Sequence, residues 1–124
     1  MPKYKSMLLL LAACLLLTGC FSTPENTSQP AFDIRGEWEY TMTASDGNTY
    51  DVGTMTFQGK PAMGTYTQVN IYDVEYEGEF TVSGNLLQLT GYETWQGAIA
   101  DANTIEGVWS HEDGFSGTFV ARRK

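Results

Sequence analysis

Apolar and polar side chains alternate in short runs from Phe32 to the end of the chain. A period of two residues is typical of β-strands that bury one face. Turn-forming residues interrupt these runs at intervals close to the roughly 8 to 12 residues of small all-β folds. The pattern predicts eight strands, at Ile34–Thr43, Tyr50–Gln58, Met63–Asn70, Tyr72–Ser83, Leu86–Tyr92, Thr94–Ala100, Thr104–Ser110 and Phe115–Arg123.

The segments between the predicted strands indicate tight antiparallel reversals. Asp46-Gly47-Asn48, Ser83-Gly84-Asn85 and Glu112-Asp113-Gly114 supply the positive φ angle or the side-chain cap that such turns require. Apolar residues do not recur at helical spacing after residue 20, so crossovers between parallel strands are not expected. We therefore expect an all-β fold, a small antiparallel up-and-down barrel of eight strands, because closure removes exposed strand edges.

Alternation also assigns the faces of the strands. In the first strand Trp38 and Tyr40 point inward, opposite glutamates. Glycine precedes a large apolar residue by two positions several times, which predicts space or a bend beside each bulky inward side chain. The fourth strand has Val74, Tyr76, Gly78, Phe80 and Val82 facing inward and the acidic row Asp73, Glu75, Glu77 and Glu79 facing outward.

The first nineteen residues have the features of an export signal. Two lysines precede an apolar run from Met7 to Leu17, which is about half the ~20 residues of a membrane-spanning helix. The sequence Leu17-Thr18-Gly19-Cys20 resembles the lipobox of bacterial lipoproteins, and that resemblance implies cleavage before Cys20 and a diacylglyceryl anchor on it. It also implies a location on the cell envelope, on the periplasmic side of the outer membrane in a Gram-negative cell.

The chain thus divides into three parts. We assign residues 1–19 to a signal peptide, 20–32 to a flexible tether rich in Ser, Thr and Pro, and 33–124 to the barrel domain. Cys14 leaves with the signal, so Cys20 is the single cysteine of the expected mature chain and no internal disulfide is available. The barrel must therefore depend on its apolar core, to which 13% aromatic residues contribute.

Charge excludes one class of partner. Loss of Lys3 and Lys5 leaves five basic against fifteen acidic side chains, a net charge of −10. Such a field repels phosphate backbones, so no nucleic-acid partner is expected. The negative charge favours cations or a basic protein partner. The alternative interpretation is that it only keeps the protein soluble.

The barrel part resembles the calycins, the group of lipocalins, fatty-acid-binding proteins and avidins. The resemblance depends on Gly36-Glu37-Trp38 in the first strand and on a basic residue that ends the last strand. In lipocalins that basic residue packs across the tryptophan at the closed end of the barrel. The resemblance therefore implies barrel closure by Trp38 and Arg123, unless a bulge exchanges Arg123 for Arg122. The flanking helix and disulfide of typical lipocalins are not found.

Seven aromatic residues of the predicted inner face have two interpretations. They line a ligand cavity, as the resemblance implies, or they fill the interior. Both are open because eight strands enclose space for packed side chains or for one small ligand. We expect a mainly filled core with binding at the open mouth, and Tyr92 and Trp95 as contacts at its rim. The candidate ligand-binding residues are Trp38, Tyr40, Tyr66, Tyr76, Phe80, Trp109 and Phe119.

Catalytic chemistry finds little support in the sequence. His111 is the single histidine and is expected to be solvated in a turn, no zinc set can be assembled, and no carboxylate lies in an apolar run that would raise its pKa. We expect no enzyme activity, no cofactor and no metal site. The acidic row of the fourth strand offers a docking surface for a basic protein, although solvated acidic faces are common.

Two functions remain as hypotheses. The first is a membrane-tethered calycin-like barrel that binds a small apolar or amphiphilic ligand. The second is a protein-interaction lipoprotein, such as an envelope inhibitor or accessory subunit, with a filled core. An open aromatic interior favours the first, and a closed core beside an exposed acidic or apolar patch favours the second.

Overall fold

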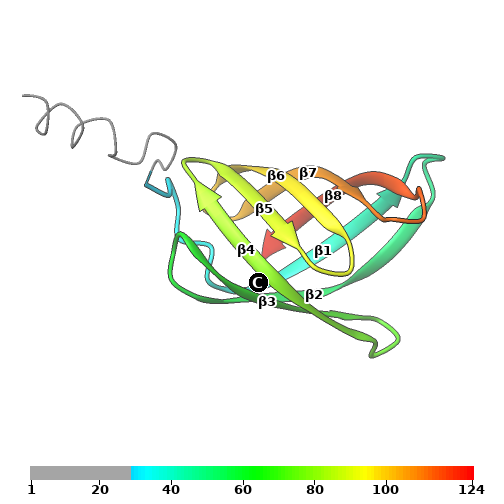
Figure 1. Cartoon of the computed structure of the whole chain (residues 1–124), viewed down its shortest axis with the longest axis horizontal. Helices are drawn as coiled ribbons and strands as arrows, with labels where there is room; N and C mark the ends of the chain where they lie inside the picture. The colour runs from blue at the N-terminus through cyan, green and yellow to red at the C-terminus, as the bar shows by residue number, and fades with distance from the viewer. Residues whose placement is uncertain (1–28) are drawn as a thin grey trace, which may run out of the picture.

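A computed structural model describes residues 29–124, which form a closed antiparallel barrel (Figure 1). The predicted signal peptide, Cys20 and most of the tether lie outside the described residues. Each strand pairs with its neighbours in sequence, and β1 closes the barrel by pairing with β8. The strands are β1 Gly36–Ala44, β2 Thr49–Gly59, β3 Met63–Asn70, β4 Glu75–Ser83, β5 Leu86–Thr90, β6 Thr94–Asp101, β7 Thr104–Ser110 and β8 Ser116–Arg123.

The predicted fold class is confirmed, because all eight predicted strands are present in an up-and-down order. Across residues 29–124 no helix is long and apolar enough to cross a membrane.

The start of β4 differs from the prediction. The side-chain oxygen of Asn70 accepts hydrogen bonds from the backbone N–H groups of Tyr72 and Val74, at 2.9 and 3.0 Å, and Asp73 has a φ of 60°. This capped turn delays the strand until Glu75, because a left-handed residue cannot continue a β-ladder. Asp73 thus leaves the acidic row, and Val74 is 42% exposed and not inward as predicted.

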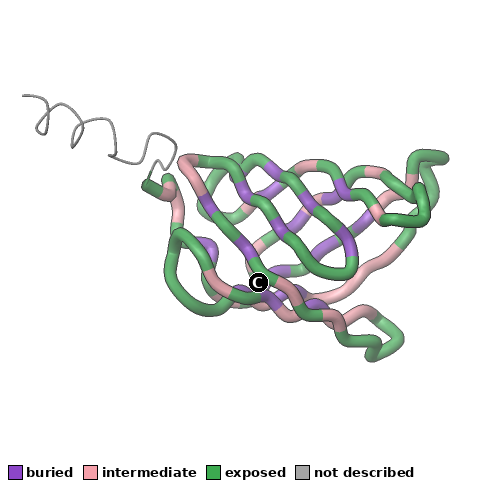
Figure 2. Tube along the Cα trace, viewed as in Figure 1, coloured by how far each residue is buried: buried purple, intermediate pink, exposed green. Residues whose placement is uncertain are grey.

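Burial alternates along the strands, as the purple and green positions of Figure 2 show. The barrel encloses seventeen apolar side chains, none more than 4% exposed. Side chains with so little accessible surface leave no room for a ligand among them, so the interior formed by the described residues is packed. Its largest members are Trp38, Trp95, Trp109, Tyr40, Tyr66, Phe57 and Phe80.

The inward glycines make room for aromatic rings on the neighbouring strand. Gly78 pairs with Tyr66, and a Cβ atom on Gly78 would lie 2.6 Å from the Tyr66 ring. Gly64 pairs with Phe80, and a Cβ atom there would lie 2.8 Å from the Phe80 ring. The space that we predicted beside Gly64 and Gly78 is therefore filled by rings across the sheet.

One end of the barrel is closed by the segment before β1. Arg123 lies with its guanidinium carbon 4.5 Å from the centroid of the Trp38 ring, and it donates hydrogen bonds to the carbonyls of Asp33, Arg35 and Ala102. The indole N–H of Trp38 donates to the carbonyl of Ile34 at 2.8 Å. These contacts close the barrel at this end, and Arg123, as the calycin resemblance implies, is the inward arginine.

Candidate functional site

The opposite end of the barrel is an open mouth, bordered by the β1–β2, β3–β4, β5–β6 and β7–β8 turns. In Figure 1 these turns lie at the right, away from the end where the described chain begins. A recess of about 310 Å³ opens there, which is near the lower limit for small-molecule pockets. We call it the mouth recess, and it is lined by Tyr50, Asp51, Asn70, Tyr72, Tyr76, Tyr92 and Glu93.

Tyrosine rings form the walls of the mouth recess. Tyr76 of β4 and Tyr92 of the β5–β6 turn are stacked, with centroids 4.7 Å apart. Tyr92 also packs against His111, with ring centroids 4.6 Å apart. Tyr50 of β2 stacks on Trp109 at 4.4 Å. The walls are therefore held by ring contacts between turns that are distant in sequence, and they present aromatic surface close to the opening.

A polar layer lies beneath these walls, on top of the apolar core. The Tyr40 hydroxyl donates to Oδ2 of Asp51 at 3.1 Å, and the buried side chain of Gln68 lies beside it. Glu93 is only 4% exposed and Trp95 only 1% exposed. Within the described residues neither Oε1 of Glu93 nor Nε1 of Trp95 has a hydrogen-bond partner. Buried polar atoms in folded proteins are almost always paired, so this pair is unusual.

Burial and charge shift the ionisation of this layer. Burial raises the pKa of the Glu93 carboxyl, and the negative charge of Asp51 raises it further. The Trp95 indole N–H and the charge of His111 act in the opposite direction. Burial, together with the charge of Glu93, raises the pKa of Tyr66 to about 12. The tyrosines therefore stay neutral at neutral pH, and burial disfavours the charged form of Glu93.

His111 is less exposed than we expected of a turn histidine. Its side chain is 10% exposed, it packs against Tyr92, and its Nδ1 accepts a hydrogen bond of 3.1 Å from the backbone N–H of Asp113. The prediction that it is merely solvated is wrong, because its ring supports the wall of the mouth recess.

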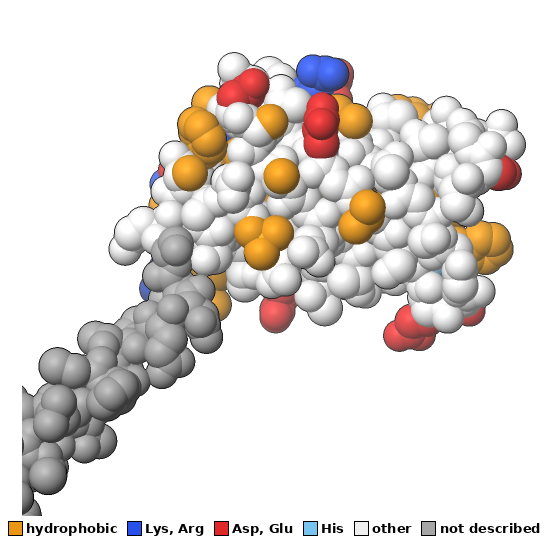
Figure 3. Space-filling view, turned by 90° about the horizontal axis from the view of Figure 1, so that it is seen from above, with side chains coloured by type: hydrophobic (Ala, Val, Ile, Leu, Met, Phe, Trp, Pro, Cys, Tyr) orange, Lys and Arg blue, Asp and Glu red, His pale blue; other side chains and the backbone are white. Residues whose placement is uncertain are grey.

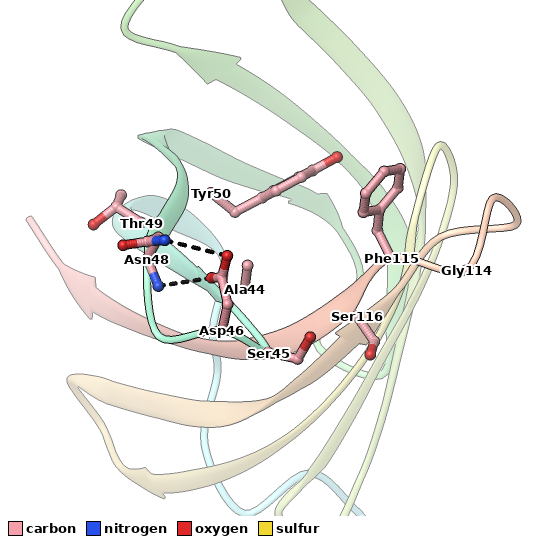
Figure 4. A pocket seen from close by; sticks show the side chains of 9 residues that line it. All are labelled: Ala44, Ser45, Asp46, Asn48, Thr49, Tyr50, Gly114, Phe115 and Ser116. Atoms are coloured by element: carbon pink, nitrogen blue, oxygen red, sulfur yellow. Dashed lines mark hydrogen bonds between the residues drawn. The ribbon is translucent and has the colours of Figure 1, made fainter.

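A second recess of about 420 Å³ lies between the β1–β2 and β7–β8 turns (Figure 4). Tyr50 and Phe115 face one another across it, with ring centroids 6.3 Å apart. Asp46 and Asn48 hold its floor through hydrogen bonds within the turn. Tyr50 is shared with the mouth recess, but no buried polar atom without a partner lines this second recess.

Charges are distributed unevenly between the two ends. The five basic side chains of the described chain, Arg35, Lys60, Arg122, Arg123 and Lys124, lie at or next to the closed end. The mouth turns carry acidic residues, and the right-hand end of the face in Figure 3 shows acidic side chains and no lysine or arginine. Asp51 and Glu93 therefore have no lysine or arginine beside them in the described part of the chain.

The candidate residues from the sequence fall into two groups. Tyr76 lines the mouth recess. The other six, Trp38, Tyr40, Tyr66, Phe80, Trp109 and Phe119, lie in the packed core.

Two predictions about the mouth need correction. Trp95 is a core residue and not an exposed rim contact, although its indole N–H lies at the polar layer; Tyr92, at 51% exposed, is at the rim. Glu93 was missed as a carboxyl with a raised pKa, because its burial comes from barrel closure and not from apolar neighbours in the sequence. The one available signal was its position between Tyr92 and Trp95.

Comparison with known proteins supports the fold. No protein-family profile and no curated protein sequence matches this chain. Among solved structures, a redesigned β-barrel covers 77% of this chain and 99% of its own, with 19% identity and a TM-score of 0.62. A designed fluorescence-activating β-barrel covers 74% and 94%, with 20% identity and a TM-score of 0.55. A redesigned β-barrel bound to DFHBI, mFAP0, covers 73% and 98%, with 22% identity and a TM-score of 0.55. The chain is therefore similar in fold to small designed barrels, one of which is seen with a small molecule bound.

Proposed function

We propose that this protein binds a small amphiphilic ligand at the mouth of its barrel and is held at a membrane surface by lipid on Cys20. The observation that carries the proposal is the pair of buried polar atoms without partners, Glu93 Oε1 and Trp95 Nε1, beneath a tyrosine-walled recess. Leaving such atoms unpaired costs about 1–3 kcal/mol each, a cost that a bound ligand offsets. The packed core directs the ligand to the mouth and not to the barrel axis.

The shape of the mouth recess supports a ligand with both an apolar and a polar part. Its walls are tyrosine rings, whereas Asp51 and Glu93 supply polar groups at its base. A pocket with mainly aromatic walls and a few convergent polar groups is the usual form of a small-molecule site. The similar barrel that holds DFHBI also supports a fold of this size as a carrier of one small molecule.

The partner-binding hypothesis retains one favourable observation. Glu75, Glu77 and Glu79 are exposed on β4, and their cross-strand neighbours on β3 are Val69, Thr67 and Thr65, so no cation neutralises them within the sheet. The adjoining β3–β4 turn exposes Ile71 by 67% and Tyr72 by 78%. An acidic strand beside an apolar turn suits a basic protein partner, which is the second candidate function.

The first experiment tests ligand binding in the chain that follows Cys20. Every strand lies in residues 36–123, and the closing contacts and the core reach back to residue 32, so the chain that follows Cys20 contains all that the barrel needs to fold. We expect the neutral dye Nile red to gain fluorescence on binding, and we expect the double variant Tyr76→Ala/Tyr92→Ala to abolish the gain. Val108→Ala, which removes exposed apolar surface on β7, should have no effect. Absence of binding, or equal binding by the double variant, would refute the proposal.

A second experiment tests the anchor. Full-length protein expressed in a Gram-negative host should incorporate a labelled fatty acid and sediment with membranes, whereas Cys20→Ser should do neither. Label retained by Cys20→Ser would show that another residue carries the lipid.

A further inference from the structure

We infer that the ligand of the mouth recess is an organic cation, whose ammonium group lies between the tyrosine walls and the carboxylates of Asp51 and Glu93. This inference rests on the proposed small-ligand function and specifies the class of ligand.

The charge of the site selects against other ligand classes. Asp51 and Glu93 line the same recess, and the charge of each raises the pKa of the Tyr50 and Tyr76 hydroxyls, after the larger effect of burial. No lysine or arginine of the described chain lines the recess, so an anionic ligand would meet only repulsion. A cation would instead complete an arrangement of opposite charges.

The tyrosine rings provide the second recognition element. Tyr76 and Tyr92 are stacked, and Tyr50, which lines the same recess, is stacked on Trp109. The faces of such rings attract ammonium groups, and cages of aromatic side chains are the common way to bind quaternary ammonium ligands. A carboxylate beneath an aromatic wall adds the opposite charge that such a cation needs.

The atoms without partners fit the same ligand. Glu93 is buried and unpaired at Oε1, so its charged form is disfavoured in the free protein. An ammonium group beside it would stabilise the charged form, and the nearby Trp95 N–H is then available to donate to the ionised carboxylate. A cation therefore relieves both groups, because it allows Glu93 to ionise and to accept a hydrogen bond from Trp95, which a neutral hydrocarbon would not do.

An organic cation fits better than a metal ion. Within residues 29–124 no three His, Cys, Asp or Glu side chains gather as a metal site would require. The recess has a volume of about 310 Å³ and mainly aromatic walls, which suit a substituted ammonium with apolar groups.

The three tryptophans allow a direct test by NMR of the ¹⁵N-labelled chain that follows Cys20. The indole N–H of Trp38 donates to Ile34 and that of Trp109 to the carbonyls of Thr43 and Thr118. The indole N–H of Trp95 lies near the Glu93 carboxyl, where it lowers the pKa of that group, but it makes no hydrogen bond of regular geometry. Phenyltrimethylammonium should shift the Trp95 indole resonance in a saturable way and leave that of Trp38, at the closed end, unchanged. The neutral isostere tert-butylbenzene and the anion 4-tert-butylbenzoate should bind at least ten-fold more weakly.

Two charge-matched variants locate the site. Glu93→Gln should weaken phenyltrimethylammonium binding at least ten-fold, whereas Glu106→Gln, which removes the same charge from the exposed face of β7, should not. Equal affinity for cation and neutral isostere, or no effect of Glu93→Gln, would overturn the inference. If phenyltrimethylammonium fails to bind while Nile red binds at the mouth, the cation inference alone is wrong; if both fail, the proposed function is wrong as well.

Discussion

The guanidinium of Arg123 covers the indole of Trp38 at a distance of 4.5 Å, which joins the end of β8 to the beginning of β1. The same guanidinium donates to three backbone carbonyls, those of Asp33, Arg35 and Ala102, at 2.7, 3.0 and 2.9 Å. One side chain therefore connects the entering segment, the β6–β7 turn and the core at the closed end.

Replacing Arg123 should destabilise the barrel. We expect Arg123→Ala to lower the free energy of unfolding by about 2–4 kcal/mol, because it removes the charge-assisted hydrogen bonds and the cation–π contact. Arg123→Lys should recover only a small part, since an ammonium cannot reach three carbonyls in one plane. Urea unfolding measures both, and Arg122→Ala is the control. An equal loss in Arg122→Ala would contradict the role given to Arg123.

A methyl group on Gly97 should overpack the core. Its Cβ atom would lie 2.7 Å from the tip of the Phe119 ring and 3.0 Å from a methyl group of Ile105. We expect Gly97→Ala to cost about 1–3 kcal/mol of unfolding free energy. The double variant with Phe119→Leu should lose less unfolding free energy than the sum of the two single changes, because the shorter leucine side chain relieves the clash. Strict additivity in the double-mutant cycle would show that the two residues do not compete for space.

Glu93 should make the protein less stable as the pH rises. Burial raises its pKa in the folded state, so between its unfolded value of 4.5 and its folded value the native chain holds more protons than the unfolded chain. Stability is therefore lost as pH rises through this window. The groups around Glu93 that share its field are Asp51 of β2, Tyr40 of β1, Tyr66 of β3, Trp95 of β6 and His111 of the β7–β8 turn.

Glu93→Gln removes that penalty. Its melting temperature should exceed that of the unaltered chain at pH 7, and the difference should shrink towards pH 4. Thermal unfolding followed by circular dichroism across pH 4–8 measures the effect. A constant difference over the whole range would mean that Glu93 does not titrate with a raised pKa.

The stacked tyrosines should affect binding more than stability. Tyr92 is 51% exposed, so Tyr92→Ala should change the unfolding free energy by less than about 1 kcal/mol. Loss of one aromatic face should weaken phenyltrimethylammonium binding roughly two- to five-fold. Phe115→Ala provides the control, because Phe115 lines only the second recess. If Phe115→Ala weakens binding and Tyr92→Ala does not, the ligand occupies the second recess.

The barrel could be predicted from the sequence because its determinants are local. Alternation places Trp38, Tyr40 and Met42 inside β1, and short turns leave antiparallel pairing as the simple solution. The start of β4 was misjudged, since Val74 continues the alternation but the side chain of Asn70 caps the turn. The strand β6 forms although Gly97 has no side chain to pack, because Phe119 and Ile105 of other strands fill the space beside it.

The mouth recess could not be predicted in the same way. Asp51 and Glu93 are far apart in the sequence and come together only because the barrel closes. The sequence places Glu93 in a turn, where carboxylates are normally solvated, whereas in the fold it is only 4% exposed and lies close to Tyr66 and Trp95. The calycin resemblance implies a ligand among the interior aromatic residues, whereas six of the seven candidates belong to the packed core.

The described chain enters the barrel at the end opposite the mouth, where the N–H of Ala31 donates to the carbonyl of Gly84 at 2.8 Å. An attachment through the N-terminus consequently joins the barrel at its closed end, so the mouth is the end farther from the point of attachment. Molecules would reach the tyrosine walls by diffusion from the bulk, without first crossing the surface to which the chain is attached.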